Sequence, residues 1–226
     1  CGFTGRIVNR DDLRREYVLR EMAAQITHRG PDSEGYYLAG EEMDDSVAMG
    51  FRRLSIIDLD GGSQPLYNED KTLVLMFNGE IYNYQALRAE LQEKGHIFAT
   101  ETDSEVLLHG FEEWKEALLP RLRGMFAFVI WNTADHSLFI ARDYFGIKPM
   151  HYSLLPDGRL LWASEIKCLL KHPDFVKEFN EDALDGYLSF QYSVPRETFF
   201  KNVYCLRPSH YLWYRNGEVS EHRYWE

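Results

Sequence analysis

Short apolar segments separated by turns recur along the chain and predict a protein rich in β-strands. Strands are predicted over residues 2–8, 46–58, 72–77, 125–132 and 137–143. The last two form a hairpin through residues 133–136, and Asn216-Gly217 predicts a second hairpin between 211–215 and 218–225, because Asn-Gly suits a type I′ turn. Segments 74–77 and 126–130 are apolar at successive positions, which indicates sheets packed both on another sheet and on helices.

Helical periodicity appears between these strands. Helices are predicted over residues 11–28, 84–95, 102–115 and 180–189. Gly95 is suited to end the second helix, and Asn180 is a suitable N-cap for the last. Hairpin-linked strands give antiparallel sheets, so the pattern predicts an α+β fold in which helices cover antiparallel sheet.

Composition narrows the class of protein. The 226 residues suffice for one large domain or two small ones, and 25 basic against 36 acidic residues give a net charge of −11. An acidic chain is a poor binder of nucleic acid. It has no apolar run of the roughly 20 residues that a membrane span needs, no secretory signal and too few cysteines, 3, for a disulfide framework. We expect a soluble cytoplasmic protein without nucleic-acid or membrane partners.

Common cofactor motifs are missing from the sequence. There is no P-loop, dinucleotide-binding glycine motif or nucleophile elbow. The 8 histidines are scattered without metal-ligand spacing, so they are interpreted as surface or core residues. We therefore predict neither a metal nor a cofactor in this chain.

The first residue carries chemistry of its own. Cys1 combines a thiol, whose ordinary pKa is about 8.5, with an α-amine near 8 that can take the thiol proton. A nucleophile and a base on the first residue are the N-terminal nucleophile arrangement. Because translation starts with methionine, we expect either that an initiator methionine is removed or that the numbering begins inside a longer product. The alternative is that Cys1 reflects numbering alone. Gly2 follows, where a substrate could approach the backbone.

A resemblance runs across essentially the whole chain. It rests on eight motifs in matching order and spacing: CGFTG (1–5), HRGPD (28–32), FRRLSIID (51–58), QPLYNED (64–70), FNGEIYNY (77–84), TDSEVLL (102–108), LRGMFAF (122–128) and ARDYFGIKP (141–149). They resemble the class II glutamine amidotransferases, in particular the glutaminase domain of glutamine-dependent asparagine synthetases. The resemblance implies the four-layer αββα sandwich of the N-terminal nucleophile hydrolases, with Cys1 as the catalytic residue.

The cation that binds the substrate carboxylate is one of two adjacent arginines. Arg52 and Arg53 point to opposite faces of a strand, and alternation alone does not choose between them. The resemblance implies Arg53, and leaves Arg52 as a solvated or salt-bridged surface residue. It also implies that the binding stretch continues along Leu54, Ser55, Ile56 and Ile57.

Asn78-Gly79 is open to two interpretations. It could be a hairpin turn, but the following segment 80–95 reads as a helix, so we expect the strand 72–77 to end there. A strand-to-helix junction can present a side-chain amide and a backbone N–H to an oxyanion. The resemblance implies that role for Asn78 and Gly79, with Glu80 lining the pocket near the substrate amine.

Asp103 is the candidate anion. Thr102 and Glu105 form a predicted capping box that puts Asp103 in the first turn of a helix, where it could simply complement the helix dipole. The resemblance implies that it binds the α-ammonium of glutamine. Weaker expectations are that HRGPD borders the pocket, that ARDYFGIKP is a fixed loop for structure or domain contact, and that two cysteines are buried: Cys168 and Cys205.

The resemblance also implies an activity. Residues 1–226 would be a glutaminase domain that hydrolyses L-glutamine to glutamate and ammonia. In the full-length enzyme a synthetase domain, with ATP and Mg²⁺, would use the ammonia to make asparagine from aspartate. That domain is not in this chain, and residues from about 180 would lead toward it. A glutaminase with another acceptor and a non-catalytic scaffold are the alternatives, and a homodimer is left open.

Overall fold

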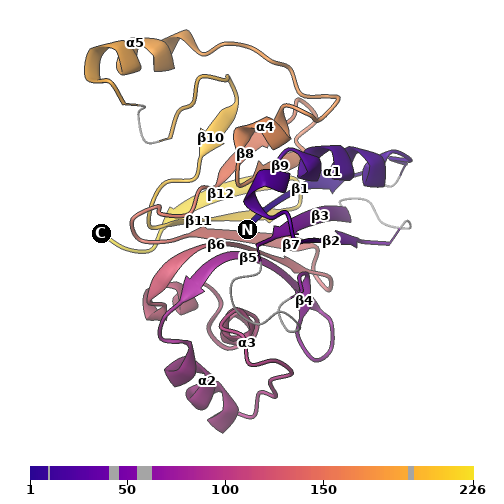
Figure 1. The fold of residues 1–226 in the computed structure, drawn as a ribbon, viewed down its shortest axis with the longest axis vertical. Helices are drawn as coiled ribbons and strands as arrows, with labels where there is room; N and C mark the ends of the chain where they lie inside the picture. Colours follow the sequence, from indigo (N-terminus) through magenta and orange to yellow (C-terminus); the bar gives the residue numbers. More distant parts are fainter. Residues whose placement is uncertain (10, 41–45, 55–62, 193–195) are drawn as a thin grey trace.

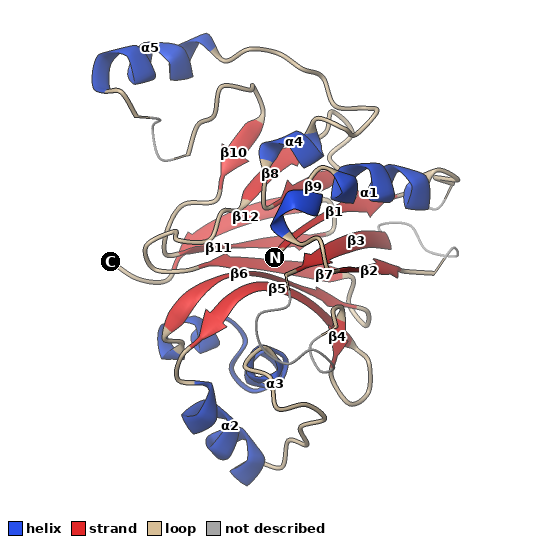
Figure 2. Cartoon of the chain, in the orientation of Figure 1, coloured by secondary structure: helices blue, strands red, loops and turns tan. Residues whose placement is uncertain are grey.

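Two antiparallel sheets are stacked face to face (Figures 1 and 2). The computed structural model describes residues 1–9, 11–40, 46–54, 63–192 and 196–226. Within that part the first sheet has the order β10-β8-β9-β1-β3-β2 and the second β12-β11-β7-β6-β5-β4, each of 6 strands. The strands are β1 (Gly2–Val8), β2 (Ser33–Leu38), β3 (Ser46–Arg53), β4 (Leu66–Tyr67), β5 (Leu73–Ile81), β6 (Gly124–Asn132), β7 (Ser137–Arg142), β8 (His151–Leu154), β9 (Leu160–Ala163), β10 (Val203–Cys205), β11 (His210–Arg215) and β12 (Glu218–Arg223).

Helices cover the outer faces of both sheets. α1 (Arg15–Ala24) and α4 (Ile166–Leu169) pack on the first sheet, and α2 (Tyr84–Glu93) and α3 (Glu105–Trp114) lie over the second (Figure 2). α5 (Glu181–Phe190) stands beyond the layers (Figure 1). Two 3₁₀ segments, Thr27–Arg29 and Lys115–Arg121, complete the helical parts described. The predicted α+β class and its four-layer αββα arrangement are confirmed.

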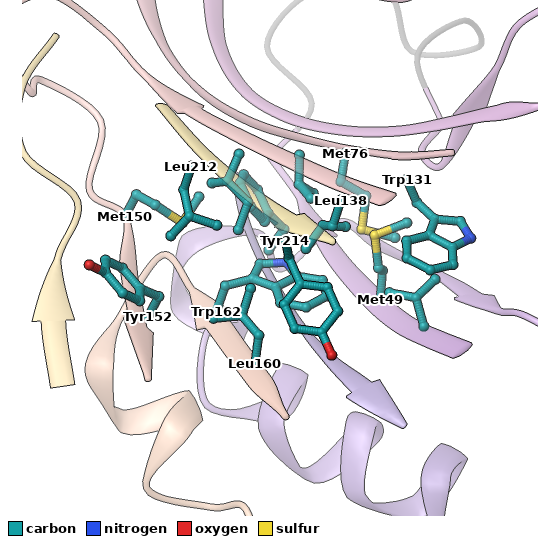
Figure 3. Close-up of a cluster of buried hydrophobic side chains, with 14 of the residues drawn as sticks. Met49, Met76, Trp131, Leu138, Met150, Tyr152, Leu160, Trp162, Leu212 and Tyr214 are labelled. Carbon is teal, nitrogen blue, oxygen red and sulfur yellow. The ribbon is translucent and has the colours of Figure 1, made fainter. Parts of the chain in front are cut away.

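Alternation along β5 explains why its sequence is apolar throughout. Val74 and Met76 face the first sheet, in the buried cluster that Figure 3 shows with Trp131 and Trp162. Their neighbours face the opposite way, toward α2 and α3: Leu73, Leu75 and Phe77. Both faces of the strand are therefore buried, as the sequence predicts.

Both predicted hairpins are confirmed. β6 pairs with β7, and β11 pairs with β12. Asn216 and Gly217 have φ of 51° and 80°, the two left-handed residues that a type I′ turn needs. Asn180 caps α5, since its side chain accepts a hydrogen bond from the Ala183 N–H. Gly95, with φ of 100°, follows α2 as expected.

Three local predictions are wrong. β5 does not end at Phe77 but continues through Asn78 and Gly79 to Ile81, because these residues stay paired with β6. The first helix is shorter than the predicted 11–28, covering Arg15–Ala24. The Thr102–Glu105 capping box does not form: the Glu105 carboxylate accepts hydrogen bonds from the backbone N–H groups of Ala99 and Thr100 instead, both at 2.7 Å.

The position of β1 determines where the N-terminus lies. β1 pairs with β3 on one side and β9 on the other, so it is a central strand of the first sheet. Cys1 therefore projects from the end of a strand held on both edges. None of the helices described is long and apolar enough to cross a membrane.

Candidate active site

A cavity of about 540 Å³ opens beside Cys1, within the size range of small-molecule sites. It lies between the start of β1, the end of β3, the second half of β5 and the connection before α3. The predicted site residues that line it are Cys1, Arg53, Leu54, Asn78, Gly79, Glu80 and Asp103. The remaining three, Ser55, Ile56 and Ile57, lie outside the described residues.

The backbone of Cys1 is held by Arg29, within the HRGPD segment. The Cys1 amine donates to the Arg29 carbonyl at 2.7 Å, and Arg29 Nε donates back to the Cys1 carbonyl at 2.9 Å. A Cβ at Gly2 would come within 3.1 Å of the Arg29 side chain, so this glycine makes room for a protein residue rather than for substrate. HRGPD thus anchors the candidate nucleophile, a more direct role than bordering the pocket.

Arg29 is fixed in turn by Glu165. The guanidinium lies 3.1 Å from the Glu165 carboxylate, which also contacts His28 at 2.9 Å and Lys167 at 3.0 Å. Burial alone would raise the pKa of Glu165, but hydrogen bonds from Lys167, Arg29 and His28 lower it to about 2. The carboxylate is therefore ionised at neutral pH and keeps Arg29 in position against Cys1.

The α-amine of Cys1 is tuned to act as a base. Burial, the Arg29 guanidinium and the Lys148 ammonium all disfavour its protonated form, and Asp32 opposes them weakly. Its pKa falls from 8.0 to about 6. At neutral pH the amine is mostly unprotonated and can accept the proton of the thiol on the same residue.

The thiol of Cys1 contacts the residue after β3. The Leu54 N–H points to Sγ with an N–S distance of 3.4 Å, and the Leu54 carbonyl lies 3.6 Å from the same sulfur. An N–H directed at sulfur favours the thiolate. Leu54 is therefore in direct contact with the candidate nucleophile.

The two adjacent arginines are separated by strand alternation. Arg52 pairs with Glu34 at 2.7 Å, directly opposite it in the β2–β3 register. Arg53 shares its face of β3 with Phe51, and both residues line the cavity. The structure places a guanidinium in the cavity at Arg53 and commits Arg52 to an ion pair.

The side chain of Asn78 brings a buried donor to the cavity wall. Asn78 is 3% exposed, yet its Nδ2 has no hydrogen-bond partner among the described residues. An unsatisfied buried amide costs about 1–3 kcal/mol, so an orphaned donor at a cavity indicates a ligand acceptor. A developing oxyanion is such an acceptor.

The N–H of Gly79 faces away from β6. Gly79 lies opposite Phe126 in the register, but Asp143 holds both backbone polar groups of Phe126: its N–H at 3.2 Å and its carbonyl at 2.8 Å. A Cβ on Gly79 would overlap the Met125 carbonyl oxygen, which explains the glycine. Gly79 therefore directs its own N–H to the open edge of β5.

The neighbouring N–H groups on that edge of β5 already donate hydrogen bonds to protein side chains. The Phe77 N–H donates to Gln64 Oε1 at 2.6 Å, and the Ile81 N–H donates to Asp103 Oδ2 at 2.7 Å. Gly79 lies between these two residues and lines the cavity. Gly79, Asn78 and Cys1 thus line one cavity, with the Gly79 N–H on the open edge of β5.

Asp103 supplies negative charge from a partly buried position. It precedes α3 rather than lying in its first turn. Burial raises its pKa from 3.8 to about 6, a shift that the Glu80 carboxylate adds to and the Ile81 N–H opposes. The acidic residues that line the cavity are Asp103, Glu80 and Glu101, the last of which pairs with Arg88, and the cations that line it include Arg53 and Lys148.

Comparison with known proteins identifies the family. Residues 1–225 match the glutamine amidotransferase domain family. The chain belongs to this family. It is 43% identical over its whole length to asparagine synthetase [glutamine-hydrolyzing] 1 of Bacillus subtilis, and 40% identical over 74% of its length to asparagine synthetase B of Escherichia coli. It spans only 35% and 29% of these two proteins.

Solved structures show the same fold as this amidotransferase domain. The glutamine phosphoribosylpyrophosphate amidotransferase of B. subtilis matches 99% of the chain with a TM-score of 0.68 at 19% identity, and the chain covers 49% of it. A structure described as the allosteric regulatory enzyme of purine biosynthesis matches with a TM-score of 0.71 at 19% identity, with the same two coverages.

Several residues that line the cavity of the amidotransferase domain were not predicted as site residues, and two of them are polar groups held in place by hydrogen bonds or by the loop that carries them: Gln64 and Lys148. Gln64 bonds both backbone groups of Phe77, accepting from its N–H and donating to its carbonyl at 2.9 Å. Lys148 also lines the cavity, at the end of the ARDYFGIKP loop. Both residues belong to motifs on which the resemblance rests, QPLYNED and ARDYFGIKP. Neither spacing nor composition, however, shows which residue of a motif faces a site.

The ARDYFGIKP loop is fixed as expected. The Asp143 carboxylate accepts the backbone N–H groups of Phe145, Ile147 and Lys148 at 2.9–3.1 Å. Ser209 has φ of 62° and donates to the Tyr144 carbonyl at 2.9 Å. These bonds hold Lys148 at the cavity.

The other two cysteines differ in environment. Cys168 is buried, as predicted, and burial raises the pKa of its thiol to about 12. The prediction that Cys205 is buried is wrong: it is partly exposed, with Arg142 Nη1 3.0 Å from its sulfur. Because a thiol with a high pKa is a poor nucleophile at neutral pH, Cys168 is not a competing nucleophile.

Proposed function

We propose that this domain hydrolyses L-glutamine to glutamate and ammonia through a thioester on Cys1. The observation that carries the proposal is that Cys1 and Asn78 line the same cavity. The thiol and an amine of pKa about 6 stand on one residue, at a cavity whose wall holds a buried amide donor without a partner among the described residues. Nucleophile, base and oxyanion donor are the three parts that acyl transfer from an amide requires.

The charges of the cavity suit a free amino acid. Glutamine has an α-carboxylate, an α-ammonium and a neutral side-chain amide. Arg53 would bind the carboxylate through paired hydrogen bonds, and Asp103, with Glu80 beside it, would bind the ammonium. The amide is then left for Cys1.

The first half of the reaction forms the thioester. The Cys1 amine takes the thiol proton, and the sulfur attacks the side-chain amide carbon of glutamine. The carbonyl oxygen becomes an oxyanion that accepts hydrogen bonds from Asn78 Nδ2 and the Gly79 N–H. The C–N bond then breaks, the amine returns its proton to the leaving nitrogen, and ammonia departs.

The second half restores the enzyme. A water molecule, deprotonated by the same amine, attacks the thioester carbon, and the same two donors stabilise the second oxyanion. The C–S bond breaks, glutamate leaves and the sulfur regains its proton. One residue thus serves as base and nucleophile in both halves, so a blocked α-amine stops the reaction.

The acceptor of the ammonia is the second part of the proposal. The relatives above are named glutamine-hydrolysing asparagine synthetases, and this chain spans about a third of their length. We infer that the domain works in cis with a synthetase domain that binds ATP and Mg²⁺ and amidates aspartate. The described cysteines are free thiols, which suits the reducing cytosol where we place the enzyme.

Glutamate release tests the hydrolysis. Cys1→Ala should lose glutamate formation from glutamine to the background rate, while Cys205→Ala, at the other partly exposed cysteine, should keep it. Equal rates for Cys1→Ala and the unmodified protein would overturn the proposal. Intact mass of the active protein should show no initiator methionine, because a retained one would block the amine.

The acceptor is tested on the full-length protein that contains this domain. With glutamine, aspartate, ATP and Mg²⁺ it should form asparagine, and Cys1→Ala should abolish synthesis from glutamine but not from added ammonium. Glutamate release without asparagine formation would keep the glutaminase and reject this acceptor.

A further inference from the structure

Four side chains that are distant in sequence meet beside α3, away from the Cys1 cavity. Glu69 comes from the turn between β4 and β5, and His96 from the connection between α2 and α3. His109 and Glu112 come from α3 itself. One ligand atom from each of the four lies within 4.8 Å of the other three.

The spacing of these atoms approaches that of a metal site. His109 Nδ1 lies 3.3 Å from Glu112 Oε2 and 3.5 Å from Glu69 Oε2. His96 Nδ1 lies 3.7 Å from Glu112 Oε2. Around a tetrahedral Zn²⁺ with bonds of about 2.0–2.1 Å, neighbouring ligand atoms are roughly 3.3 Å apart. Small side-chain movements would bring the four donors into that geometry.

A second layer of hydrogen bonds orients the donors. His109 directs its other ring nitrogen, Nε2, to Glu105 Oε1 at 3.4 Å, and Glu105 is 4% exposed. Asn68 Nδ2 donates to Glu112 Oε1 at 3.0 Å, and the Ile97 N–H donates to Glu69 Oε1 at 3.1 Å. A carboxylate behind a ligating imidazole, and hydrogen bonds to ligating carboxylates, are typical of metal centres.

The surroundings favour a cation at this point. Glu69, Glu105 and Glu112 surround one imidazole, with Glu113 3.9 Å from His96 Nε2 and Lys94 3.3 Å from Glu113. The Phe98 ring packs on His109 with centroids 4.5 Å apart and shields its face. Either a proton on His109 or a metal ion can balance the negative charge of the carboxylates. Only a metal ion would bind both imidazoles and the carboxylates of Glu69 and Glu112 together.

We propose that Glu69, His96, His109 and Glu112 bind one Zn²⁺ ion in a closed tetrahedral site. Two imidazoles and two carboxylates suit Zn²⁺ better than the oxygen-preferring Mg²⁺ or Ca²⁺, and they make the site neutral overall. With four protein ligands the site has no open position, so its role is structural. It ties α3 and the preceding connection to the β4–β5 turn.

Zn²⁺ titration of the Cys1→Ser variant tests the site. This background removes the N-terminal thiol, which together with its amine is itself a zinc chelator. After EDTA treatment and dialysis the protein should bind one equivalent of Zn²⁺ by calorimetry, and its Tm should rise with added Zn²⁺. Co²⁺ in place of Zn²⁺ should give the visible absorption of a tetrahedral complex.

Ligand variants in the same background localise the ion. His96→Gln and Glu69→Gln should each weaken Zn²⁺ binding roughly 100-fold or more. His222→Gln and Glu181→Gln, at exposed positions elsewhere, should leave it unchanged. Glu69 is 41% exposed and lies in a turn, so its variant should keep the fold even if another does not. Failure to bind Zn²⁺ would mean that a protonated His109 alone satisfies the carboxylates, and binding retained in both ligand variants would mean that the ion binds elsewhere. Either result would overturn the proposal.

Discussion

Asp103 accepts a hydrogen bond of 2.7 Å from the Ile81 N–H, on the open edge of β5. This bond ties the connection before α3 to the strand that carries Asn78 and Gly79, three and two residues before Ile81. The carboxyl is buried enough to have a pKa of about 6. The candidate anion for the substrate ammonium therefore changes charge close to physiological pH.

We expect the KM for glutamine to rise as the pH falls below about 6. Protonation of Asp103 removes the charge that would pair with the α-ammonium, while glutamine itself does not change charge between pH 5 and 7. Steady-state kinetics over that range measure the effect. In Asp103→Asn the KM should be high and flat across the same range, and a wild-type KM that is also flat would contradict the assignment.

The same protonation of Asp103 that weakens glutamine binding should stabilise the folded protein. The pKa of Asp103 is raised on folding, from 3.8 to about 6, so the folded state binds the proton more tightly than the unfolded chain does. Lowering the pH from 7 toward 4 should therefore increase the contribution of this group to the free energy of unfolding, by up to about 3 kcal/mol. Asp103→Asn should lack this contribution in urea unfolding of the ligand-free protein.

The acid side of the pH–rate profile should also report the Cys1 amine. The amine acts only when unprotonated, so kcat/KM should rise with pH through about 6. Lys148→Met removes a positive charge that lowers this pKa, and should move the rise to higher pH. Lys201→Met, whose exposed ammonium pairs with Glu178 and does not line the cavity, is the control and should leave the profile in place. A Lys148→Met profile that stays or moves to lower pH would exclude the amine as the base.

The fold was accessible from local pattern because most of its strands pair with neighbours in sequence. Both hairpins and the double-sided burial of β5 follow from alternation and turn chemistry. The end of β5 was not accessible. Asn78-Gly79 has the composition of a turn, but pairing with Ala127 and Phe126 keeps it extended, and such pairing is invisible in a local window.

The candidate site could be predicted from the sequence only in part. Motif resemblance indicated which segments to expect, and the structure places seven of the named residues around one cavity. Local pattern could not choose between Arg52 and Arg53, because the choice depends on Glu34 across the sheet. Nor could it show that His96 and His109, 13 positions apart, have rings 5.1 Å from one another.

Arg53→Ala should raise the KM for glutamine by roughly 10- to 100-fold, the equivalent of about 1.5–3 kcal/mol for charged hydrogen bonds. Arg52→Ala should change the KM little, since that guanidinium is engaged by Glu34. Each variant removes one arginine side chain from β3, so the two change the net charge of the protein equally and differ only in position. A larger effect at Arg52 would show that the wrong arginine is assigned to the substrate.

Asn78→Ala separates catalysis from stability. Removing one oxyanion donor typically lowers kcat by about 10²- to 10³-fold, and the KM should change little because the donor acts on charge that develops in the transition state. Stability should change little as well, since Nδ2 makes no hydrogen bond among the described residues that the variant could lose. Asn180→Ala is the matched control. Asn180 is also buried, but it caps α5 and bonds the Thr198 carbonyl at 3.0 Å.

The control should show the inverse result. Asn180→Ala should lose about 1–2 kcal/mol of stability, as expected for an N-cap, and keep its kcat, because neither Asn180 nor any residue of α5 lines the cavity. α5 stands beyond the sheet layers (Figure 1). Thermal unfolding and single-turnover glutamate release on both variants decide the matter. If Asn78→Ala kept its kcat while losing stability like Asn180→Ala, the orphaned amide would be a structural residue, and the oxyanion would have to be stabilised by the Gly79 N–H without it.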